Sequence, residues 1–411
     1  SPFVPQGRLA HTSIHVGDKI YFFGGVHNSG VTSKEIFYLD VTRPFDTALP
    51  PWTELSIISP IPVESAWATV STNIKKSTIY LIGGIPFKTI IHSYEIETHE
   101  WNNLPGITLV GRRNMQAVSN DSGKIYIFGG FVNSPSGLQF TNELTIIDIN
   151  SLSLSIGSTM GAPLARMLYT ATMLPNGIIV YIGGQGTDDA DGDPYVDMSQ
   201  INLYDTKKGA WSLKRARSVH SAVLTPDNKI IIFGGEKNNI NKIAVKAVPD
   251  LAILEIQDGS YIWTVPQTSS DIGEYPSLGA HTAHLVGNYM IVAFGNYTTP
   301  NYIPLDHTNP NIYIMDIKSF TWVKAFEPPV SPITTTQNSP SNTTTTQISP
   351  TGPSNLKNDE DQTNNTLKLV IATLSGIVGT ALFVALVFFM YKRHQKSKIL
   401  RVHGSYRSTM L

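Results

Sequence analysis

The sequence predicts an all-β fold, a six-bladed β-propeller, and two observations carry that prediction. First, short apolar segments ending in a Gly-Gly pair recur at steps of 46 to 61 residues, a period typical of propeller blades built from short strands. Second, a strand that ends in an acidic residue follows each pair, and in four repeats a large apolar residue stands six positions after the acid, as in Glu95 to Trp101. An insertion delays Trp52 in the first repeat, and Trp263 closes the fifth. The expected blades span approximately residues 7–60, 61–107, 108–162, 163–213, 214–273 and 274–328.

The Gly-Gly pairs mark the second strand of each blade. The residues before each pair are apolar without alternation, which predicts a strand that is buried on both faces. A sixth, degenerate copy reads VAFGN, with Gly295 and Asn296 in place of the pair. The five intact pairs are Gly24 and Gly25, Gly83 and Gly84, Gly129 and Gly130, Gly183 and Gly184, and Gly234 and Gly235.

A tryptophan closes most of the repeats, and Leu154 takes its place in the third. We expect each indole to pack between neighbouring blades and to bury ~150–250 Å². An Arg- and His-bearing strand opens several repeats, as in RLAH at Arg8–His11. The tryptophans of the pattern are Trp52, Trp101, Trp211, Trp263 and Trp322.

Together, the Gly-Gly pairs, the acid-ended strands and the spaced tryptophans resemble the kelch repeat over residues 7–328. The resemblance implies a kelch-type propeller that acts as a binding platform. The same superfamily contains galactose oxidase, whose copper-radical cofactor uses a Tyr cross-linked to a Cys. This chain has no cysteine, so we expect neither that activity nor a cofactor, and predict that the protein is not an enzyme.

Composition excludes several other classes of function. The absence of cysteine rules out disulfides, zinc-thiolate sites and thiol catalysis. Residues 1–391 hold 24 basic and 31 acidic residues, a formal charge of −7, which argues against nucleic acid as a partner.

The carboxy-terminal part predicts a membrane anchor. Residues 329–367 are rich in Ser, Thr, Pro and Asn and are expected to form a disordered stalk. Within the predicted transmembrane helix at 368–391, residues 369–391 carry no charge, long enough to span a bilayer at ~1.5 Å per residue. The tail at 392–411 holds six basic residues and no acid, which places it in the cytosol.

This topology predicts a single-pass type I protein of the plasma membrane or another secretory-pathway membrane, with its propeller on the extracellular or lumenal side. The chain opens at Ser1, so we expect either a removed signal peptide or a truncated start. A tail-anchored scaffold with a cytosolic propeller is the alternative. The candidate glycosylation sequons are Asn120, Asn296, Asn342 and Asn364.

Loop length suggests where a ligand binds. Long segments follow the Gly-Gly position in blades 4, 5 and 6, near 185–199, 236–250 and 297–311, and equivalent propeller loops emerge on one face. We expect them to form a rim that binds a protein or a glycan. Insertions without function, or an enzyme acting on surface carbohydrates, remain alternatives. The candidate binding residues are Asp188, Asp189, Asp191, Asp193, Tyr195, Lys237, Lys242, Tyr297, Tyr302, Asp306 and His307.

No metal site is expected. His11, His220 and His281 occupy one register of the repeat, so blade packing explains them better than a metal cluster does. His281 and His284 are three apart on a strand, which directs them to opposite faces. The acidic run at 188–193 resembles the opening of a calcium loop, but the acidic residue that would complete such a loop is missing, which favours a solvated loop.

Overall fold

The computed structural model describes residues 2–329 except 88, 135–136, 187–199, 216–217, 239–243, 258 and 300–306. The chain divides into two units, Ser1–Ile333 and Thr334–Leu411, and every described residue belongs to the first. Within this described part the fold is all-β, and it contains no helix that could cross a membrane. The predicted transmembrane segment and cytosolic tail, and all of the predicted stalk except Pro329, lie outside the described residues.

The described residues form six larger sheets, which we number 1 to 6 in chain order. Each has four antiparallel strands in sequence order, and sheet 6 gains a fifth strand, β31 (Ser269–Ser270), parallel to β37. The first strands are β2 (Thr12–Val16), β8 (Thr69–Thr72), β13 (Ala117–Ser119), β20 (Thr170–Met173), β25 (Ser221–Leu224) and β33 (Thr282–Val286). The second strands are β3 (Lys19–Phe23), β9 (Thr78–Ile82), β14 (Lys124–Phe128), β21 (Ile178–Ile182), β26 (Lys229–Phe233) and β34 (Tyr289–Ala293).

The outer half of each sheet follows the same order. The third strands are β5 (Ile36–Asp40), β10 (His92–Glu95), β17 (Leu144–Asp148), β23 (Gln200–Asp205), β29 (Leu251–Gln257) and β36 (Ile312–Asp316). The fourth strands are β7 (Trp52–Glu54), β11 (Trp101–Asn103), β18 (Ser153–Ile156), β24 (Ala210–Arg215), β30 (Ser260–Thr264) and β37 (Thr321–Val323).

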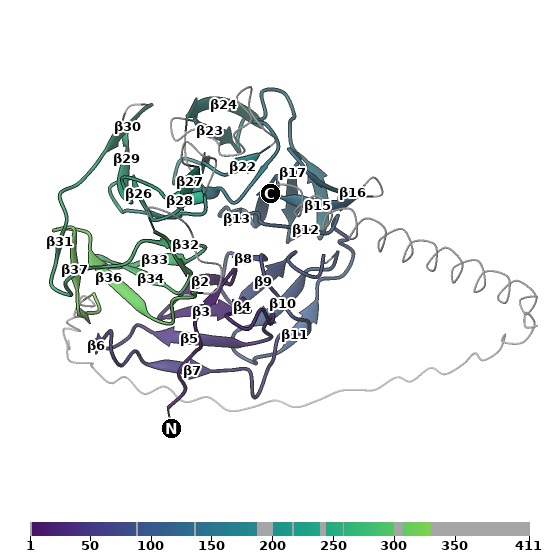
Figure 1. Ribbon diagram of the computed structural model, residues 1–411. Helices are drawn as coiled ribbons and strands as arrows, with labels where there is room; N and C mark the ends of the chain where they lie inside the picture. Colours follow the sequence, from purple (N-terminus) through teal and green to yellow (C-terminus); the bar gives the residue numbers. More distant parts are fainter. Residues whose placement is uncertain are drawn as a thin grey trace, which may run out of the picture. The chain divides into compact units, whose positions relative to one another are not determined.

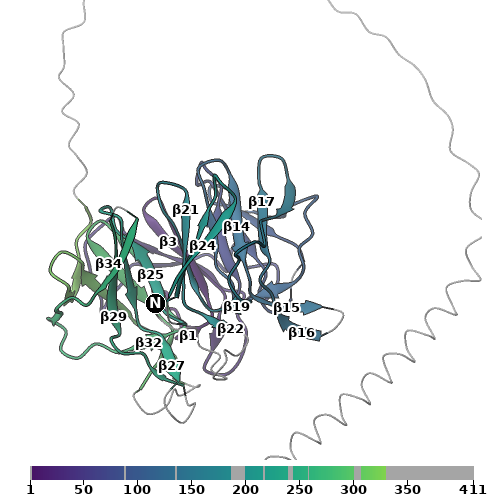
Figure 2. The same ribbon diagram turned by 90° about the horizontal axis from the view of Figure 1, so that it is seen from above.

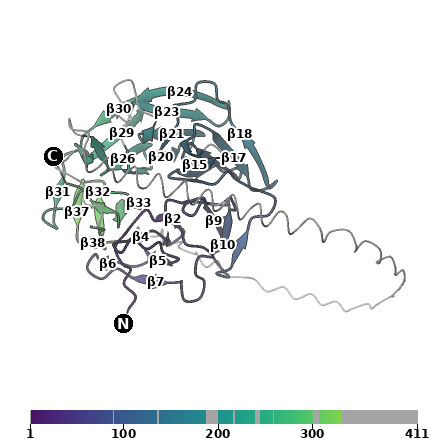
Figure 3. The same ribbon diagram turned by 45° about the vertical axis from the view of Figure 1, so that its right-hand side comes forward.

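The six sheets follow one another around a common centre in sequence order (Figure 1 and Figure 3). Each first strand contacts the first strand of the next sheet, and β33 of sheet 6 contacts β2 of sheet 1. The first strands therefore line the centre of a ring. This arrangement is the propeller-like architecture that the repeat predicts.

The second strands carry the core. In β9 all five residues are buried, and in the other five second strands only the first residue is partly exposed. Burial on both faces follows from the stacking of each sheet between two neighbours, which explains why these runs lack polar alternation.

The tryptophans of the repeat contact aromatic rings of the preceding sheet. Trp101 lies 6.1 Å from Phe23 of sheet 1, and Trp211 lies 5.0 Å from Phe128 of sheet 3, between ring centroids. Trp322 is fully buried and lies 5.0 Å from Phe233 of sheet 5. Trp52 stacks on sheet 6, and Trp263 packs against the cluster shared by sheets 4 and 5.

Within the described residues, a backbone hydrogen bond from the second residue of the pair joins one sheet to the next at five of the six seams. The second glycine donates its N–H to a carbonyl just before the next sheet's first strand, as in Gly25 to Ser65 at 2.8 Å. A Cβ on the first glycine, Gly24, would overlap that same Ser65 carbonyl oxygen. The corresponding bonds run from Gly84 to Arg112, Gly130 to Arg166, Gly235 to Leu278 and Gly295 to Arg8, all at 2.8–2.9 Å.

The sixth copy of the pair lies one residue earlier than predicted, at Phe294 and Gly295. Gly295 makes the bond of a second glycine, so the first-glycine position is Phe294 and not Gly295. Phe294 has the left-handed φ of 58° that Gly24 has at 60°. Its N–H donates to Asn311, as that of Gly24 donates to Glu35. Asn296 lies one position beyond the pair, in β35 (Asn296–Tyr297).

At the closure of the ring, the described strands of sheet 1 and of sheet 6 each come from one continuous part of the chain. All four strands of sheet 1 come from residues 12–54, and sheet 6 comes entirely from 269–323. A separate two-stranded ladder pairs β38 (Ala325–Phe326), just after sheet 6, with β6 (Phe45–Asp46), from the insertion before Trp52. The segment near Phe326 therefore contributes to closure beside the blades.

We predict that Gly24→Ala destabilises the protein by about 2–5 kcal/mol, the sum of left-handed strain and overlap with the Ser65 carbonyl. Gly30→Ala is the matched control, because Gly30 also has positive φ but has no atom near its Cβ position. It should cost only about 1–2 kcal/mol. Unfolding in denaturant measures both values, and equal losses would show that contact with the next sheet is not what requires glycine.

Candidate functional site

Four residues precede or enter the first strand of each sheet, and we name them the quartets. Their third residue has a left-handed backbone in every sheet: Ala10, Trp67, Asn114, Leu168, Val219 and Ala280, with φ between 52° and 61°. Each of these residues from Trp67 onward donates its N–H to the carbonyl of the one before it, at 2.8–3.2 Å. The described quartet residues are Arg8–His11, Ser65–Ala68, Arg112–Met115, Arg166–Tyr169, Ser218–His220 and Leu278–His281.

The quartet is not one continuous strand, so the prediction of an Arg- and His-bearing strand is wrong in this detail. In sheet 1 the first two residues form β1 (Arg8–Leu9), which pairs with β4 (Val26–His27). The left-handed Ala10 then turns the chain into β2. The quartet is therefore a corner between the blade and one face of the ring.

The six corners surround a central cavity of about 160 Å³. It is lined by the third and fourth quartet residues of all six sheets, together with Gln116 and Thr170. A second cavity of about 170 Å³ shares six lining residues with it, namely Ala68, Met115, Gln116, Thr170, His220 and His281. His284 and mainly Ser, Thr and Ala of the first strands complete the second lining. Among the described residues that line either cavity, none is Asp, Glu, Lys or Arg.

The recurring histidines bind hydroxyl groups of neighbouring first strands. His11 Nε2 lies 2.9 Å from Thr282 Oγ1, His220 Nε2 lies 2.9 Å from Thr170 Oγ1, and His281 Nε2 lies 2.8 Å from Ser221 Oγ. Each pair joins two adjacent sheets, so these residues are packing contacts of the ring. In the described part of the chain no three His, Cys, Asp or Glu side chains are grouped so as to hold a metal.

Burial keeps His11, His281 and His284 neutral near neutral pH. It lowers the pKa of His281 to about 3, and it lowers the pKa of His11 well below its ordinary value with help from Arg8. His284, whose Nε2 lies 2.7 Å from Ser13 Oγ, also has its pKa lowered to about 3 by burial. Near neutral pH these three histidines thus offer uncharged donors and acceptors, suited to water or a neutral polar group.

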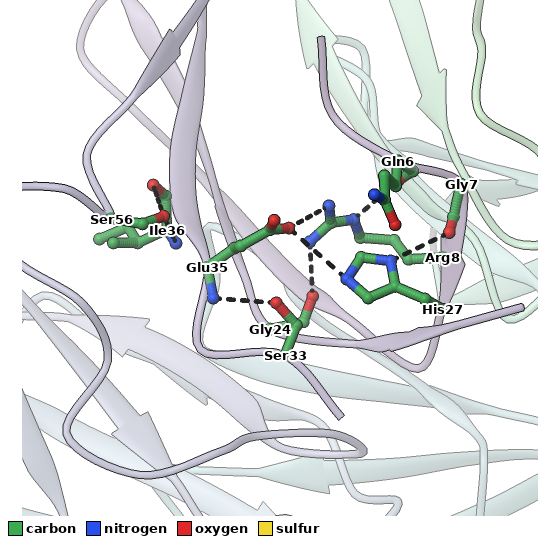
Figure 4. A network of polar contacts seen from close by, with 9 residues as sticks. All are labelled: Gln6, Gly7, Arg8, Gly24, His27, Ser33, Glu35, Ile36 and Ser56. Atoms are coloured by element: carbon green, nitrogen blue, oxygen red, sulfur yellow. Dashed lines mark hydrogen bonds and ion pairs between the residues drawn. The ribbon is translucent and has the colours of Figure 1, made fainter. Parts of the chain in front are cut away.

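A buried arginine fixes the chain after the first glycine. In sheet 1, Arg8 Nη1 donates to the Gly24 carbonyl at 3.0 Å and Nη2 to Glu35 at 2.5 Å (Figure 4). His27 lies beside the same carboxylate, at 3.7 Å. Sheet 3 repeats the pair with Arg112, which donates to the Gly129 carbonyl and to Glu143. Because the arginine is buried, loss of the carboxylate would leave a buried charge without its partner.

The other arginines of the quartets differ. Arg166 donates to the Gly183 carbonyl at 3.3 Å, and burial lowers its pKa to about 10, which still leaves it charged near neutral pH. Sheet 6 has Leu278 at this position, and Asn309 instead donates its amide N–H to the Phe294 carbonyl at 3.0 Å. The carbonyl at the first-glycine position is therefore satisfied by different side chains in different sheets.

The segments that follow the glycine pairs form a second layer on one face of the ring, which we call the loop face. Short strands of this layer lie to the same side of the six sheets (Figure 2). They pair with the quartets or with each other. They include β12 (Arg112–Arg113), β15 (Phe131–Ser134), β16 (Gly137–Phe140), β19 (Arg166–Met167), β22 (Gln185–Gly186), β27 (Glu236–Asn238), β28 (Ala244–Lys246) and β32 (Leu278–Gly279), besides β1, β4 and β35.

Only part of the predicted rim can be placed. Lys237 is exposed on β27, Tyr297 is partly buried on β35, and His307 is exposed. The Tyr297 N–H donates to the His307 carbonyl at 3.2 Å, so the structure brings these two together. The remaining candidates lie outside the described residues: Asp188, Asp189, Asp191, Asp193, Tyr195, Lys242, Tyr302 and Asp306.

The loops of sheets 5 and 6 meet around a cavity of about 540 Å³, which we name the rim cavity. The Lys246 N–H of β28 donates to the Thr299 carbonyl at 2.9 Å, which joins the two loops. The cavity is lined by Lys246, Glu274, Tyr275, Pro276, Ser277, Tyr297, Thr298, Thr299 and Tyr313.

Sequence reasoning missed a loop-face element in sheet 3. The hairpin β15–β16 follows its glycine pair, with Phe131 and Phe140 in edge contact at 5.3 Å. The guanidinium of Arg113 lies between the rings of Phe87 and Phe131, at 5.2 and 5.3 Å. The signal was present, because FVNSPSGLQF is two short runs around a Ser-Pro-Ser-Gly turn. The long loops are thus not confined to blades 4–6.

Comparison with known proteins identifies the family. The Attractin/LZTR1 beta-propeller model matches residues 2–216, more than half of the chain. This chain belongs to the Attractin/LZTR1 beta-propeller family. The prediction of a kelch-type propeller is confirmed at this level.

Relatives and solved structures agree with this assignment. The chain is 26% identical over 259 residues to kelch domain-containing protein 3 of Rattus norvegicus and 27% identical over 264 residues to the Homo sapiens protein. Each match covers 57% of this chain and 65% of the relative, so it spans less than two thirds of that protein. The solved structure of YjhT matches with a TM-score of 0.57 at 13% identity, over 78% of this chain and 98% of that one, and shows the fold alone.

Two of the four predicted glycosylation sites lie in the described part. Asn296 is only 5% exposed within β35, which leaves no room for a glycan, so this sequon is removed from the candidates. Asn120 is partly exposed in a turn, and its amide N–H donates to Tyr126 Oη at 3.3 Å. Asn342 and Asn364 lie outside the described residues.

We predict that acid destabilises the ring through its buried histidines. An unfolded histidine takes up a proton below its ordinary pKa of 6.5, whereas folded His281 takes one up only near pH 3. Stability should therefore fall as pH drops from 6.5 towards 3, by about 1.4 kcal/mol per pH unit for this residue.

His281→Gln should reduce that slope by about one proton, and His307→Gln, at an exposed position, serves as the control. Denaturant unfolding between pH 7 and pH 5 measures the slopes. An unchanged slope in His281→Gln would mean that His281 is protonated in the folded protein.

Proposed function

We propose that this protein is a recognition module that binds a protein or glycan ligand through the loop face of a six-bladed kelch-type propeller. The proposal rests on a structural difference between the two layers, since the sheets are regular and the loop face is variable. The six sheets are joined by repeated backbone bonds, while the segments after the glycine pairs gather on one face and differ in length and chemistry. Ligand sites commonly occupy such variable loops on a rigid scaffold.

Binding is favoured over catalysis by the chemistry of the centre. The described linings of both central cavities lack Asp, Glu, Lys and Arg, and burial keeps His11, His281 and His284 in them neutral. Membership of a propeller family related to kelch domain-containing proteins supports the same conclusion. The loop face instead offers charged and aromatic side chains, such as Arg113, Lys246 and Tyr297.

The proposal includes a membrane anchor. The uncharged run at 369–391, preceded by an acidic cluster and followed by six basic residues, is the pattern of a single-pass helix with a cytosolic carboxy terminus. The propeller would then lie on the extracellular or lumenal side of the plasma membrane or another secretory-pathway membrane, and the Ser- and Thr-rich stalk would hold it away from the bilayer.

We predict that the full-length chain, expressed with a secretory signal, carries N-glycans in its stalk. Glycosidase treatment should increase its gel mobility, and Asn342→Gln with Asn364→Gln should remove most of that shift, because the proposed stalk would leave both sequons accessible. Asn296→Gln should leave the shift unchanged, since the folded protein buries that residue.

Protease added to intact cells completes the test. It should remove the propeller and leave an epitope on residues 392–411 intact. An unglycosylated chain whose propeller resists protease until the cells are permeabilised would overturn the proposed topology and favour a cytosolic scaffold.

A further inference from the structure

The hairpin β15–β16 and strand β12 form a small three-stranded sheet on the loop face of sheet 3 (Figure 2). Arg113 pairs with Phe131, which in turn pairs with Phe140, so these three residues lie in one row across the strands. Residues opposite each other in antiparallel strands have side chains on the same face, and so do residues two apart along one strand. Asn133 and Leu138, which pair with each other, therefore form the next row of that face. We name the surface of these five residues the hairpin face.

Two aromatic rings hold the guanidinium of Arg113 in place. Its Cζ lies 5.2 Å from the ring centroid of Phe87 and 5.3 Å from that of Phe131. Phe87 packs directly against Gly111, where a Cβ would lie 3.0 Å from the Phe87 Cβ. A guanidinium that is held between rings keeps its plane fixed, and its N–H donors point out from the edge of that plane.

Arg113 has no carboxylate partner among the described residues. The arginines that form ion pairs there are Arg8, with Glu35, and Arg112, with Glu143. Burial lowers the pKa of Arg113 with no acid to oppose the effect, whereas at Arg8 the Glu35 carboxylate opposes it. Arginine stays charged near neutral pH, so the hairpin face carries a positive charge that no described acid balances.

A ligand can reach this charge. Arg113 is partly exposed, and because its Nε is buried, the two terminal nitrogens are the donors that remain accessible. Two such nitrogens can hold one carboxylate through a pair of parallel hydrogen bonds, which is the strongest arrangement that arginine forms. The clamp thus presents a fixed pair of donors to an anion.

The rest of the hairpin face is mainly apolar. Leu138 is 56% exposed, and the partly exposed rings of Phe131 and Phe140 contact each other at 5.3 Å. Asn133 is the other polar side chain on this face. An acidic sugar would bring many hydroxyl groups that need partners, and this surface offers few. A peptide with one acidic and one apolar side chain fits both parts of the surface.

We propose that the hairpin face binds an acidic segment of a partner protein, with one Asp or Glu carboxylate on Arg113 and an apolar side chain on Phe140 and Leu138. Arg113 and Phe140 lie two strands apart, which is roughly 10 Å at ~4.8 Å per strand. An extended peptide covers that distance in about three residues, at ~3.1–3.3 Å each. The acidic and the apolar residue should therefore be about three positions apart. The inference rests on the proposed function, because it assigns a class of partner to the loop face.

The test uses the full-length chain in a non-ionic detergent and an array of peptides that are capped at both ends. Each peptide has Asp or Glu three positions before or after Phe or Leu, and its matched peptide has Asn or Gln in place of the acid. Acidic peptides should bind, and calorimetry should show about tenfold weaker binding of the matched amide, because only the carboxylate pairs with the guanidinium. This preference should decrease as the salt concentration rises.

Three variants locate the preference. Arg113→Gln should remove it, so that the acidic and the amide peptide bind equally. Arg43→Gln is the matched control, because it removes the same charge from an exposed position between β5 and β6 and should keep the preference. Leu138→Ser should weaken both peptides of a pair several-fold without lowering Tm, since the Leu138 side chain is exposed.

Two results would overturn the inference directly: no acidic peptide binds, or the preference for the acid persists in Arg113→Gln. Sialyllactose is the second probe. If it binds, requires Arg113 and no peptide binds, then the partner is an acidic glycan and the assignment to a protein is wrong, although recognition by the loop face stands. Stalk glycosylation and surface protease sensitivity are measured separately, so the proposed topology is judged on its own result.

Discussion

The ring depends on one backbone hydrogen bond, which runs from the second residue of a glycine pair to the chain that enters the next sheet. The described residues show this bond at five of the six seams. At the seam of sheets 1 and 2, Gly25 donates to Ser65, and at the closing seam Gly295 donates to Arg8. The bond requires the two backbones to approach so closely that a Cβ at Gly24 would meet the acceptor. Because the same bond also joins the last sheet to the first, repetition of one local geometry is sufficient to close the ring.

That close approach also determines the centre. Holding the quartet backbone against the preceding sheet forces its third residue to turn sharply, and Trp67 and Val219 adopt left-handed conformations that are normally costly for such side chains. Strain of this kind often marks an active site. Here it recurs in one register in all six sheets and is supported by a chain of backbone bonds, so it belongs to the architecture. The loop face is left free to vary.

Much of the fold could be predicted because its determinants are local. Gly24 and Gly25, or Glu95 and Trp101, are close in sequence and repeat. The predicted position of the sixth pair was wrong because Phe294 adopts a left-handed backbone conformation that is typical of glycine. Only the packing of Phe294 against Trp52 and Phe22 accounts for that conformation. The rim cavity could not be predicted either. Its side chains come from four segments, and only the folded chain brings them together.

At the closing seam, between sheets 6 and 1, side-chain packing helps to join two sheets that are not consecutive in the sequence. Sheets 6 and 1 share no strand, and their junction instead gathers Phe294 between Trp52, at 5.7 Å, and His11, at 5.4 Å. Arg8 lies over the same Phe294 ring while it holds Glu35 and the Gly24 carbonyl. A phenylalanine at the first-glycine position is therefore tolerated where the neighbouring sheet offers an aromatic pocket. At this seam the aromatic packing adds to the Gly295 backbone bond and to the β6–β38 ladder, and together they hold the first and last sheets against each other.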